Sequence, residues 1–264
     1  SSLQDFIGSD EVDAVYVATP HSDHFVYALE AIKYKKHVLC EKPLTMNAHE
    51  SMILLDLAQS SNVFLMEAYM YRTHPQTLNI LNNLHLLTET NKKILIEGSF
   101  GFKADVPVDH RLRNPLLGGG AILDVGCYPL SMSKLIAGHL QGTAFAEPQS
   151  ISATGRFDAT GVDLQSDAHL IFSESIEAKI SCAIDEELSN QLVIASGEVS
   201  ITVPQPWHCG QFQGGQSSIT IVNESGLVEE ILCDDQIGLF TREIEHASSC
   251  ILDQKLESSL ISHA

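Results

Sequence analysis

The first 70 residues alternate short apolar runs with segments of helical periodicity. "VDAVYVATP" (12–20) is almost unbroken apolar sequence rich in β-branched residues, which is typical of a strand covered on both faces of a parallel sheet. "HVLCEKP" (37–43) and "VFLMEAYMY" (63–71) have the same character. Between these runs apolar residues recur at helical spacing. Asn47, with Glu50 three residues later, predicts the capped start of a helix.

The order strand, helix, strand, helix, strand predicts part of a doubly wound α/β domain over residues 1–70, with a parallel sheet and right-handed crossovers. From about residue 94 apolar and polar residues alternate, which predicts antiparallel strands with one buried face. Helical segments are expected at 118–138 and near the end of the chain. Residues 71–264 are therefore expected to form an α+β domain with a large, mostly antiparallel sheet. The alternating segments are "KILIEGSFGF", "VDLQSDAHLIFS", "SIEAKISCAI", "LVIASGEVSITV" and "SSITIVN".

Composition indicates a globular protein and disfavours polyanionic partners. Of the 264 residues, 44% are apolar and 19% are charged, which separates the chain from disordered and fibrous classes. Fifteen Lys and Arg against 34 Asp and Glu give a net charge of -19, so the average field repels nucleic acid and anionic membrane surfaces. An anionic cofactor is compatible with this charge, because a helix N-terminus and one or two cations bind phosphate locally.

The spacing of the cysteines and the length of the apolar runs indicate the cellular compartment of the protein. The six cysteines are scattered without a C-x-x-C pair, and this pattern favours buried thiols in a reducing compartment over a disulfide framework. No apolar run approaches membrane-spanning length, and the first ten residues lack the charged start and apolar core of a secretion signal. The sequence therefore predicts a cytoplasmic protein without a membrane segment.

Lys42 directly follows an apolar strand and precedes a proline. In doubly wound sheets ligands bind beyond the carboxyl ends of the strands, where "ATP" (18–20) and "EKP" (41–43) are both expected. Pro43 stiffens the backbone after the lysine and fixes the direction of the cation. Position alone leaves two interpretations open, a solvated surface lysine or a charge held at the rim of the sheet.

The glycine run of "GGGAILDVGCYP" precedes a second group of candidate residues. Consecutive glycines let the chain approach another surface closely. A helix after them would place Asp124 and Tyr128, four residues apart, on one face. Gly126 and Pro129 weaken that helix and predict a kink beside Tyr128. A buried tyrosine hydrogen-bonded to an aspartate for packing is the structural alternative.

Five segments, in this order and spacing, resemble the Gfo/Idh/MocA family of pyridine-nucleotide sugar and polyol oxidoreductases. The resemblance extends over essentially the whole chain and is greatest to the dimeric dihydrodiol dehydrogenases and the NADP-dependent D-xylose dehydrogenases. It implies a Rossmann-type cofactor domain, NADP or NAD as cofactor, and a sugar, polyol or trans-diol substrate. Inositol dehydrogenases carry histidine at the position of Tyr128, which disfavours that subgroup. The segments are "ATPHSDH", "HVLCEKPL", "EAYMYRTHPQ", "LGGGAILDVGCYP" and "EIEH".

The resemblance implies that Lys42, Asp124 and Tyr128 form the catalytic set. Oxidation of a carbinol needs a base for the hydroxyl proton, and a free tyrosine, with a pKa of about 10, is weakly ionised at neutral pH. A Lys42 ammonium within about 4–6 Å is expected to lower the pKa of Tyr128 and to make it the proton acceptor, or the donor in reduction. Asp124 is expected to orient the tyrosine or the substrate hydroxyl.

The family also implies contacts around this set. Glu67, after the third strand, is expected on the nicotinamide side, and an ion pair with a helix explains it equally well. Arg111 is expected to line the substrate region, with a solvated arginine as the alternative. His21 and His24 lack an evident third ligand, so no metal site is predicted. The residues implied to lie along the dinucleotide are Thr19, Pro20, His21, His24, Glu41 and Lys42.

Departures from the family pattern qualify these expectations. No G-x-G-x-x-G turn occurs in the chain, so the sequence is interpreted as starting within the cofactor domain and as ending before the family's last helix. The 264 residues alone are therefore expected to bind a dinucleotide weakly.

A non-catalytic relative that binds a nucleotide or sugar, as a sensor or assembly subunit, is the rival hypothesis. The open face of the second sheet is expected to contact another subunit, in a homodimer or larger homo-oligomer, as in dimeric members.

Overall fold

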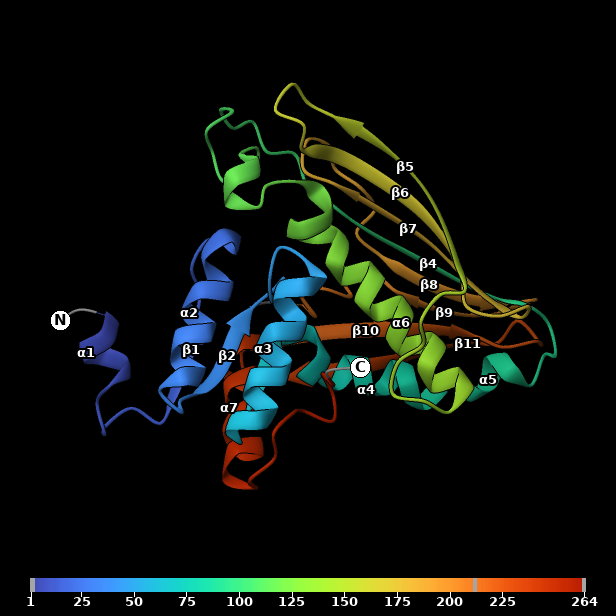
Figure 1. The fold of residues 1–264 in the computed structure, drawn as a ribbon. Coiled ribbons are helices and arrows are strands. Elements are labelled where there is room, and N and C mark those ends of the chain that lie inside the picture. Colours follow the sequence, from blue (N-terminus) through green and yellow to red (C-terminus); the bar gives the residue numbers. More distant parts are fainter. Residues whose placement is uncertain (1–2, 211–212, 263–264) are drawn as a thin grey trace.

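Three parallel strands form the first sheet of the chain, shown in Figure 1 as a computed structural model that describes residues 3–210 and 213–262. The order is β1-β2-β3, and each connection carries a helix that packs on the same face. The side chain of Asn47 accepts the N–H of Glu50 at 3.0 Å, which confirms the predicted helix cap. The elements are α1 (Leu3–Ile7), β1 (Ala14–Val17), α2 (His21–Lys33), β2 (His37–Glu41), α3 (Ala48–Ser61) and β3 (Leu65–Ala68).

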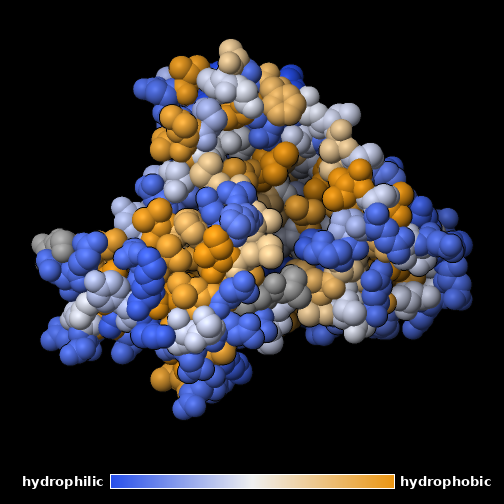
Figure 2. Space-filling view, in the orientation of Figure 1, coloured by the Kyte–Doolittle hydropathy of each residue, from blue (hydrophilic) through white to orange (hydrophobic). Residues whose placement is uncertain are grey.

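The two faces of this small sheet belong to two different hydrophobic cores. Val38 and Cys40 of β2 point toward α2 and α3 and pack there with Leu54. Leu39, between them, points to the opposite face and joins the larger core of the molecule. Alternate residues of β2 thus bury on opposite sides, as expected for a strand covered on both faces. Figure 2 shows that apolar side chains also reach the surface over α2 and α3, where Met52 is 62% exposed.

A second sheet of eight strands follows, in the order β11-β10-β9-β8-β4-β7-β6-β5. Its pairs are antiparallel except for the parallel pair of β4 and β7 at the centre. The predicted fold class, a partial doubly wound sheet followed by a large and mostly antiparallel one, is confirmed. The strands are β4 (Ile94–Gly101), β5 (Ser150–Phe157), β6 (Asp163–Ile171), β7 (Ile176–Ala183), β8 (Leu192–Ser196), β9 (Val199–Val203), β10 (Gly215–Val222) and β11 (Val228–Asp235).

Helices cover one face of the large sheet, and one returns to the small sheet. In Figure 1, α4, α5 and α6 lie along the large sheet, whereas α7 packs against β2. No helix of the described residues covers the other face of the large sheet. The helical elements are η1 (Met70–Thr73), α4 (Pro75–Asn83), α5 (His85–Thr88), η2 (Pro115–Leu117), the π-helical turn η3 (Ile122–Gly126), α6 (Cys127–Gln141) and α7 (Leu239–Leu252).

The two edge strands of the large sheet, β5 and β11, were not predicted. In β5 the apolar Ile151, Ala153 and Phe157 alternate with polar residues, but all eight of its residues are exposed. All six cysteines are unpaired thiols, five of them buried. In the part of the chain that the structure describes, no helix is both long and apolar enough to cross a membrane.

Candidate active site

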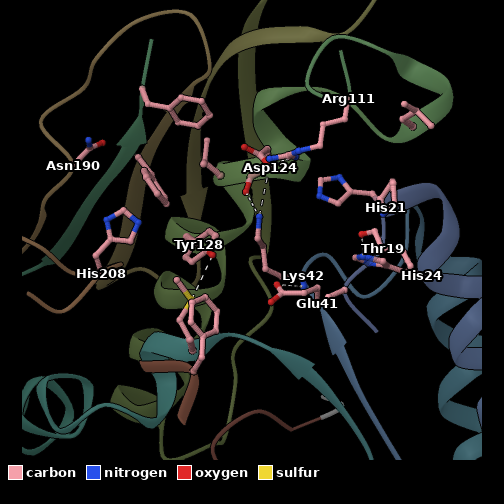
Figure 3. Close-up of a pocket in the computed structure, with 18 residues that line it drawn as sticks. Thr19, His21, His24, Glu41, Lys42, Arg111, Asp124, Tyr128, Asn190 and His208 are labelled. Carbon is pink, nitrogen blue, oxygen red and sulfur yellow. Dashed lines mark hydrogen bonds and ion pairs between the residues drawn. The ribbon is translucent and has the colours of Figure 1, made fainter. Parts of the chain in front are cut away.

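A cleft of about 790 Å³ lies between the carboxyl ends of β1 and β2 and the turn that enters α6. Figure 3 shows side chains from both sides converging on it. Of the residues that the sequence singled out, the small-sheet side contributes Thr19, Pro20, His21, His24, Glu41 and Lys42, and the opposite side contributes Arg111, Asp124 and Tyr128.

Lys42 is held against the opposite wall of the cleft. Its Nζ donates to the backbone carbonyl of Asp124 at 2.6 Å and lies 3.7 Å from the Oδ1 of the same residue. The ammonium is also 5.2 Å from the centre of the Tyr128 ring. The side chain of Lys42 is 14% exposed, so the two oxygens offset the loss of hydration of its charge. Of the two interpretations left open by the sequence, the structure favours the held charge.

The carbonyl that receives this ammonium belongs to an irregular turn. Residues Ile122–Gly126 form a π-helical turn, a geometry that is frequent at functional sites. Pro129 lies five residues after Asp124 and has no backbone N–H, so it donates no helical hydrogen bond to that carbonyl. The irregularity predicted beside Tyr128 is therefore present, and it leaves an acceptor pointing at the cleft.

Tyr128 lies at the base of the cleft and is 5% exposed. Its hydroxyl donates to the Sδ of Met70 at 3.6 Å. Burial raises the pKa of this phenol well above its ordinary value of 10, and the neighbouring Cys127 and Glu41 raise it further. The predicted lowering of this pKa by Lys42 is therefore wrong for this structure, because the ammonium bonds to facing oxygens and desolvation of the phenolate outweighs its field. At neutral pH the phenol keeps its proton.

The carboxylate of Asp124 is shared by two cations. Its Oδ1 accepts from the Nη1 of Arg111 at 2.9 Å, on the side opposite to Lys42. Asp124 is 6% exposed, whereas the Arg111 side chain is 49% exposed at the mouth of the cleft. Among the described residues no side-chain hydrogen bond joins Asp124 to Tyr128: the carboxylate of Asp124 accepts from Arg111, and the hydroxyl of Tyr128 donates to Met70.

The glycine run contacts the small-sheet side of the cleft. The carbonyl oxygen of Gly118 lies 2.9 Å from the Nδ1 of His21. A Cβ at Gly118, where φ is +74°, would lie 2.7 Å from the Cβ of His21. The predicted close approach at the glycines is confirmed. Burial lowers the pKa of His21, so its ring is neutral at pH 7 and donates from Nδ1.

His24 joins the two strand ends. It is fully buried, with Nδ1 2.8 Å from the carbonyl oxygen of Pro43 and Nε2 2.9 Å from that of Thr19. Both ring nitrogens thus face backbone carbonyls, and neither is presented to a metal ion. Over residues 3–210 and 213–262, no group of three or more His, Cys, Asp and Glu side chains is placed to hold a metal.

Two polar groups at the strand ends fit a dinucleotide. The Oγ1 of Thr19 is buried and has no hydrogen-bond partner among the described residues. A buried hydroxyl without a hydrogen-bond partner destabilises the fold, and a ribose or phosphate oxygen would supply that partner. Glu41 accepts from the hydroxyl of Tyr16 and from the backbone N–H of Lys42, which fixes its carboxylate at the same rim. These residues fit a nicotinamide dinucleotide.

Glu67 is the one predicted site residue that does not line the cleft. Its Oε1 accepts the backbone N–H of Leu44 at 2.8 Å, and burial raises the pKa of its carboxyl group. Together with Arg72 and Lys134 it lines a separate cavity of about 190 Å³. The structure therefore does not place Glu67 at the cofactor cleft, because a backbone donor holds its carboxyl group elsewhere.

Residues from β4 and later segments complete the cleft, and of these Phe100, Asn190 and His208 were not predicted. Phe100, at the end of β4, packs edge-on against Tyr128 with ring centres 5.2 Å apart. Asn190 and His208 come from the segments that follow β7 and β9, and Phe240 comes from α7. Strand alternation predicts where such loops begin but not which loop residue faces a cleft, so no sequence signal marks Asn190 and His208.

Comparisons with known proteins agree with this architecture. Residues 1–69 match the model of the GFO_IDH_MocA family, described as an oxidoreductase family with an NAD-binding Rossmann fold. The whole chain is 33% identical over 266 aligned residues to trans-1,2-dihydrobenzene-1,2-diol dehydrogenase of Danio rerio and spans 76% of that protein. Over 70% of the chain it is 31% identical to a D-xylose 1-dehydrogenase (NADP(+)) of Haloferax volcanii, of which it spans 54%.

Solved structures share the fold. An aldose-aldose oxidoreductase from Caulobacter crescentus superimposes with a TM-score of 0.81 at 22% identity, covering 98% of this chain and 74% of that one. A 3-ketoreductase from Actinomadura kijaniata, solved in complex with NADP and TDP-benzene, gives a TM-score of 0.80 at 22% identity, covering 95% and 73%. At this level of identity the likeness concerns the fold.

Proposed function

The chain belongs to the Gfo/Idh/MocA family of oxidoreductases, and on this premise we propose that it transfers a hydride between NADP or NAD and a hydroxyl-bearing carbon of a sugar, polyol or trans-diol. The observation that carries the proposal is the convergence of Lys42, Asp124 and Tyr128 in one cleft at the carboxyl ends of β1 and β2. Ligands of doubly wound sheets bind at that edge. The relatives named above act on a diol and on D-xylose.

Thr19, Pro20, His21, Glu41 and Lys42 are proposed to hold the dinucleotide. They line the cleft from the side of the small sheet, where the Oγ1 of Thr19 is without a partner. When bound, a nicotinamide supplies or accepts the hydride. The protein's own part is then to orient the substrate and to move one proton.

Tyr128 is proposed to move that proton. Because burial raises its pKa, the phenol is protonated at neutral pH and is ready to donate from its Oη to a carbonyl oxygen during reduction. As the proton leaves, negative charge forms on the ring, and the Lys42 ammonium at 5.2 Å from the ring centre offsets it. In the oxidative direction the same oxygen must first lose its proton, so oxidation is expected to be favoured by high pH.

Asp124 is proposed to position the groups around Tyr128. Its carboxylate holds Arg111 at the mouth of the cleft, and its backbone carbonyl holds the ammonium of Lys42. These contacts fix the direction of two long, otherwise mobile cations. Arg111, half exposed and already fixed at one nitrogen, is proposed to contact a substrate oxygen with its remaining donors.

The test is turnover by the full-length protein with NADP(H) and NAD(H), on a panel of D-xylose, other aldoses and trans-diols. Tyr128→Phe is expected to lower kcat by about 10²–10⁴-fold, since positioned proton transfer contributes about that much. Tyr34→Phe, which alters a 43% exposed tyrosine outside the cleft, serves as the control. Wild-type turnover in Tyr128→Phe would refute the assignment of Tyr128. Absence of turnover on the whole panel would favour the non-catalytic alternative.

We also infer that the open face of the large sheet contacts a second copy of the chain. β8 and β9 alternate buried and half-buried residues, so one of their faces is only partly covered within a protomer. At the edge, β5 exposes all eight of its residues. Light scattering after size-exclusion chromatography is expected to give at least a dimer, and a monomer at micromolar concentration would refute this inference.

A further inference from the structure

A second cavity opens beside the active-site cleft. It has a volume of about 600 Å³ and shares Phe100, Asn190 and His208 with the lining of the cleft. We call it the side cavity. Its further walls come from the segments around Ser189 and Gln205. Figure 3 shows Asn190 and His208 on the side of Tyr128 that faces away from His21 and Thr19. The side cavity therefore extends the substrate side of the cleft and not the cofactor side.

The lining of the side cavity is polar and uncharged. Its polar groups are a serine hydroxyl, carboxamides and an imidazole, and the described residues that line it include no Asp, Glu, Lys or Arg. Burial lowers the pKa of His208, so its ring is neutral at pH 7 and has one donor and one acceptor nitrogen. The cavity can exchange hydrogen bonds with hydroxyl groups in both directions. It offers no cation to offset a phosphate or carboxylate that leaves water.

The polar walls are fixed by contacts within the protein. The amide of Asn190 accepts the N–H of Gly101 at 2.6 Å and donates to its carbonyl at 2.9 Å. The hydroxyl of Ser189 lies 2.8 Å from that of Ser99. Asn190 has a φ of +51°, a left-handed conformation that asparagine tolerates better than most residues. These groups are therefore preorganised, and binding a ligand would cost little further ordering.

Phe100 stands between the reacting end of the cleft and the side cavity. Its ring lies 5.2 Å from that of Tyr128, 5.5 Å from that of His208 and 5.9 Å from that of Trp207, on which it stacks with an interplanar angle of 16°. The indole N–H of Trp207 donates to the carbonyl of Ser99 at 2.8 Å, so this aromatic wall is rigid. A ring that reacts beside Tyr128 would direct a substituent past Phe100 into the side cavity.

We propose that the side cavity is a subsite for a second, neutral sugar ring, so that the preferred substrate is a disaccharide or glycoside. The proposal rests on the proposed function, because it takes Tyr128 to mark the reacting ring. Xylobiose and D-xylose give a matched pair of substrates. Glucuronosyl-xylose, a disaccharide in which glucuronic acid replaces the non-reducing xylose, tests the charge argument, since its second ring is anionic and its reducing end is free.

The test compares kcat/KM for these three compounds in the full-length protein with NADP. Xylobiose is expected to exceed D-xylose by at least about tenfold, which two further hydrogen bonds suffice to give. Glucuronosyl-xylose is expected to fall below xylobiose. Isothermal titration of the protein with xylobiose and D-xylose, without cofactor, is expected to give the same order of affinity and does not depend on turnover.

Gln205→Ala probes the subsite itself. The hydrogen bonds of Gln205 to Gln76 and Cys209 use its backbone carbonyl, so alanine retains them and removes the carboxamide of a residue that lines the side cavity. The ratio of kcat/KM for xylobiose over D-xylose is expected to fall about tenfold in Gln205→Ala. It is expected to be unchanged in Gln191→Ala, an exposed glutamine that lines neither cavity.

The outcomes separate this inference from the proposed function. Two results would refute the subsite but not the proposed dehydrogenase activity. One is turnover of D-xylose with no higher kcat/KM for xylobiose. The other is a ratio of kcat/KM for xylobiose over D-xylose that is the same in Gln205→Ala and the wild type. A preference for glucuronosyl-xylose over xylobiose also overturns the subsite. Lack of turnover of all three compounds and of every diol overturns both proposals.

Discussion

Glu243 on α7 is a carboxyl group buried almost completely within the protein, and its protonation should set how stability depends on pH. It is 1% exposed, and its Oε1 has no hydrogen-bond partner among the described residues. Burial, and next the nearby carboxylate of Glu41, raises the pKa of Glu243 from 4.5 to about 9. We predict that Glu243→Gln, which keeps the shape but does not titrate, stabilises the protein increasingly as pH rises.

The magnitude follows from the difference in proton affinity between the folded and unfolded states. Between pH 4.5 and about 9 the folded chain retains a proton on Glu243 that the unfolded chain releases. The unfolding free energy of the wild type therefore decreases with pH by about 1.4 kcal/mol per unit in this window, relative to a variant without the titrating group. The unfolding free energy of Glu243→Gln minus that of the wild type is therefore expected to be about 3 kcal/mol larger at pH 8 than at pH 6.

Urea denaturation followed by circular dichroism at pH 6, 7 and 8 measures this difference. Glu245→Gln, an exposed glutamate on the same helix, is the control and is expected to keep a constant difference from the wild type. A constant difference for Glu243→Gln as well would show that the carboxylate is ionised in the folded protein. The desolvation argument would then be refuted.

Two further predictions concern the cleft. In the oxidative direction, log kcat/KM is expected to rise by about one unit per pH unit from pH 7 to 9, because the pKa of Tyr128 lies well above 10; a pH-rate profile that is level from pH 7 would contradict the raised pKa. Gly118→Ala is expected to lower the unfolding free energy by more than Gly142→Ala does. The two glycines have φ of +74° and +75°, but only at Gly118 would a Cβ meet another residue, at 2.7 Å from His21. Equal losses of about 1–2 kcal/mol in the two variants would mean that backbone strain accounts for the whole loss of unfolding free energy. The contact of the new Cβ with His21 would then add no destabilisation.

The sequence predicted the inner strands of both sheets and missed the two edge strands of the large sheet, β5 and β11. The strand of "HVLCE" is recognisable because Val38 and Cys40 face one core and Leu39 faces the other, which makes the whole run apolar. β5 is paired only with β6 and exposes every residue, so the alternation of Ile151, Ala153 and Phe157 with polar residues is not accompanied by burial. Its existence depends on hydrogen bonds to a neighbour, which hydropathy does not encode.

The composition of the site was more predictable than its electrostatics. Lys42 and Tyr128 were singled out from their motifs, and the structure places the Lys42 ammonium 5.2 Å from the centre of the Tyr128 ring. The sign of the pKa shift of Tyr128 was not predictable, since it depends on how completely other segments bury the phenol. Met70, Phe100 and Trp207 come from three different segments and together remove water from it. The desolvation of a side chain depends on the assembled site, whereas the charge of a lysine is known from the sequence alone.

The same distinction explains how a chain with a net charge of -19 can hold an anionic cofactor. Lys42 and Arg111 flank the carboxylate of Asp124, and Glu41 adds a second carboxylate at the rim, so the formal charges that line the cleft sum to zero. Surface carboxylates more than about 10 Å away are largely screened by salt at 0.1 M. The partly buried cations act at contact distance and are screened much less. The local balance of two cations and two carboxylates therefore governs binding in the cleft, and the global charge governs solubility and the choice of partners outside it.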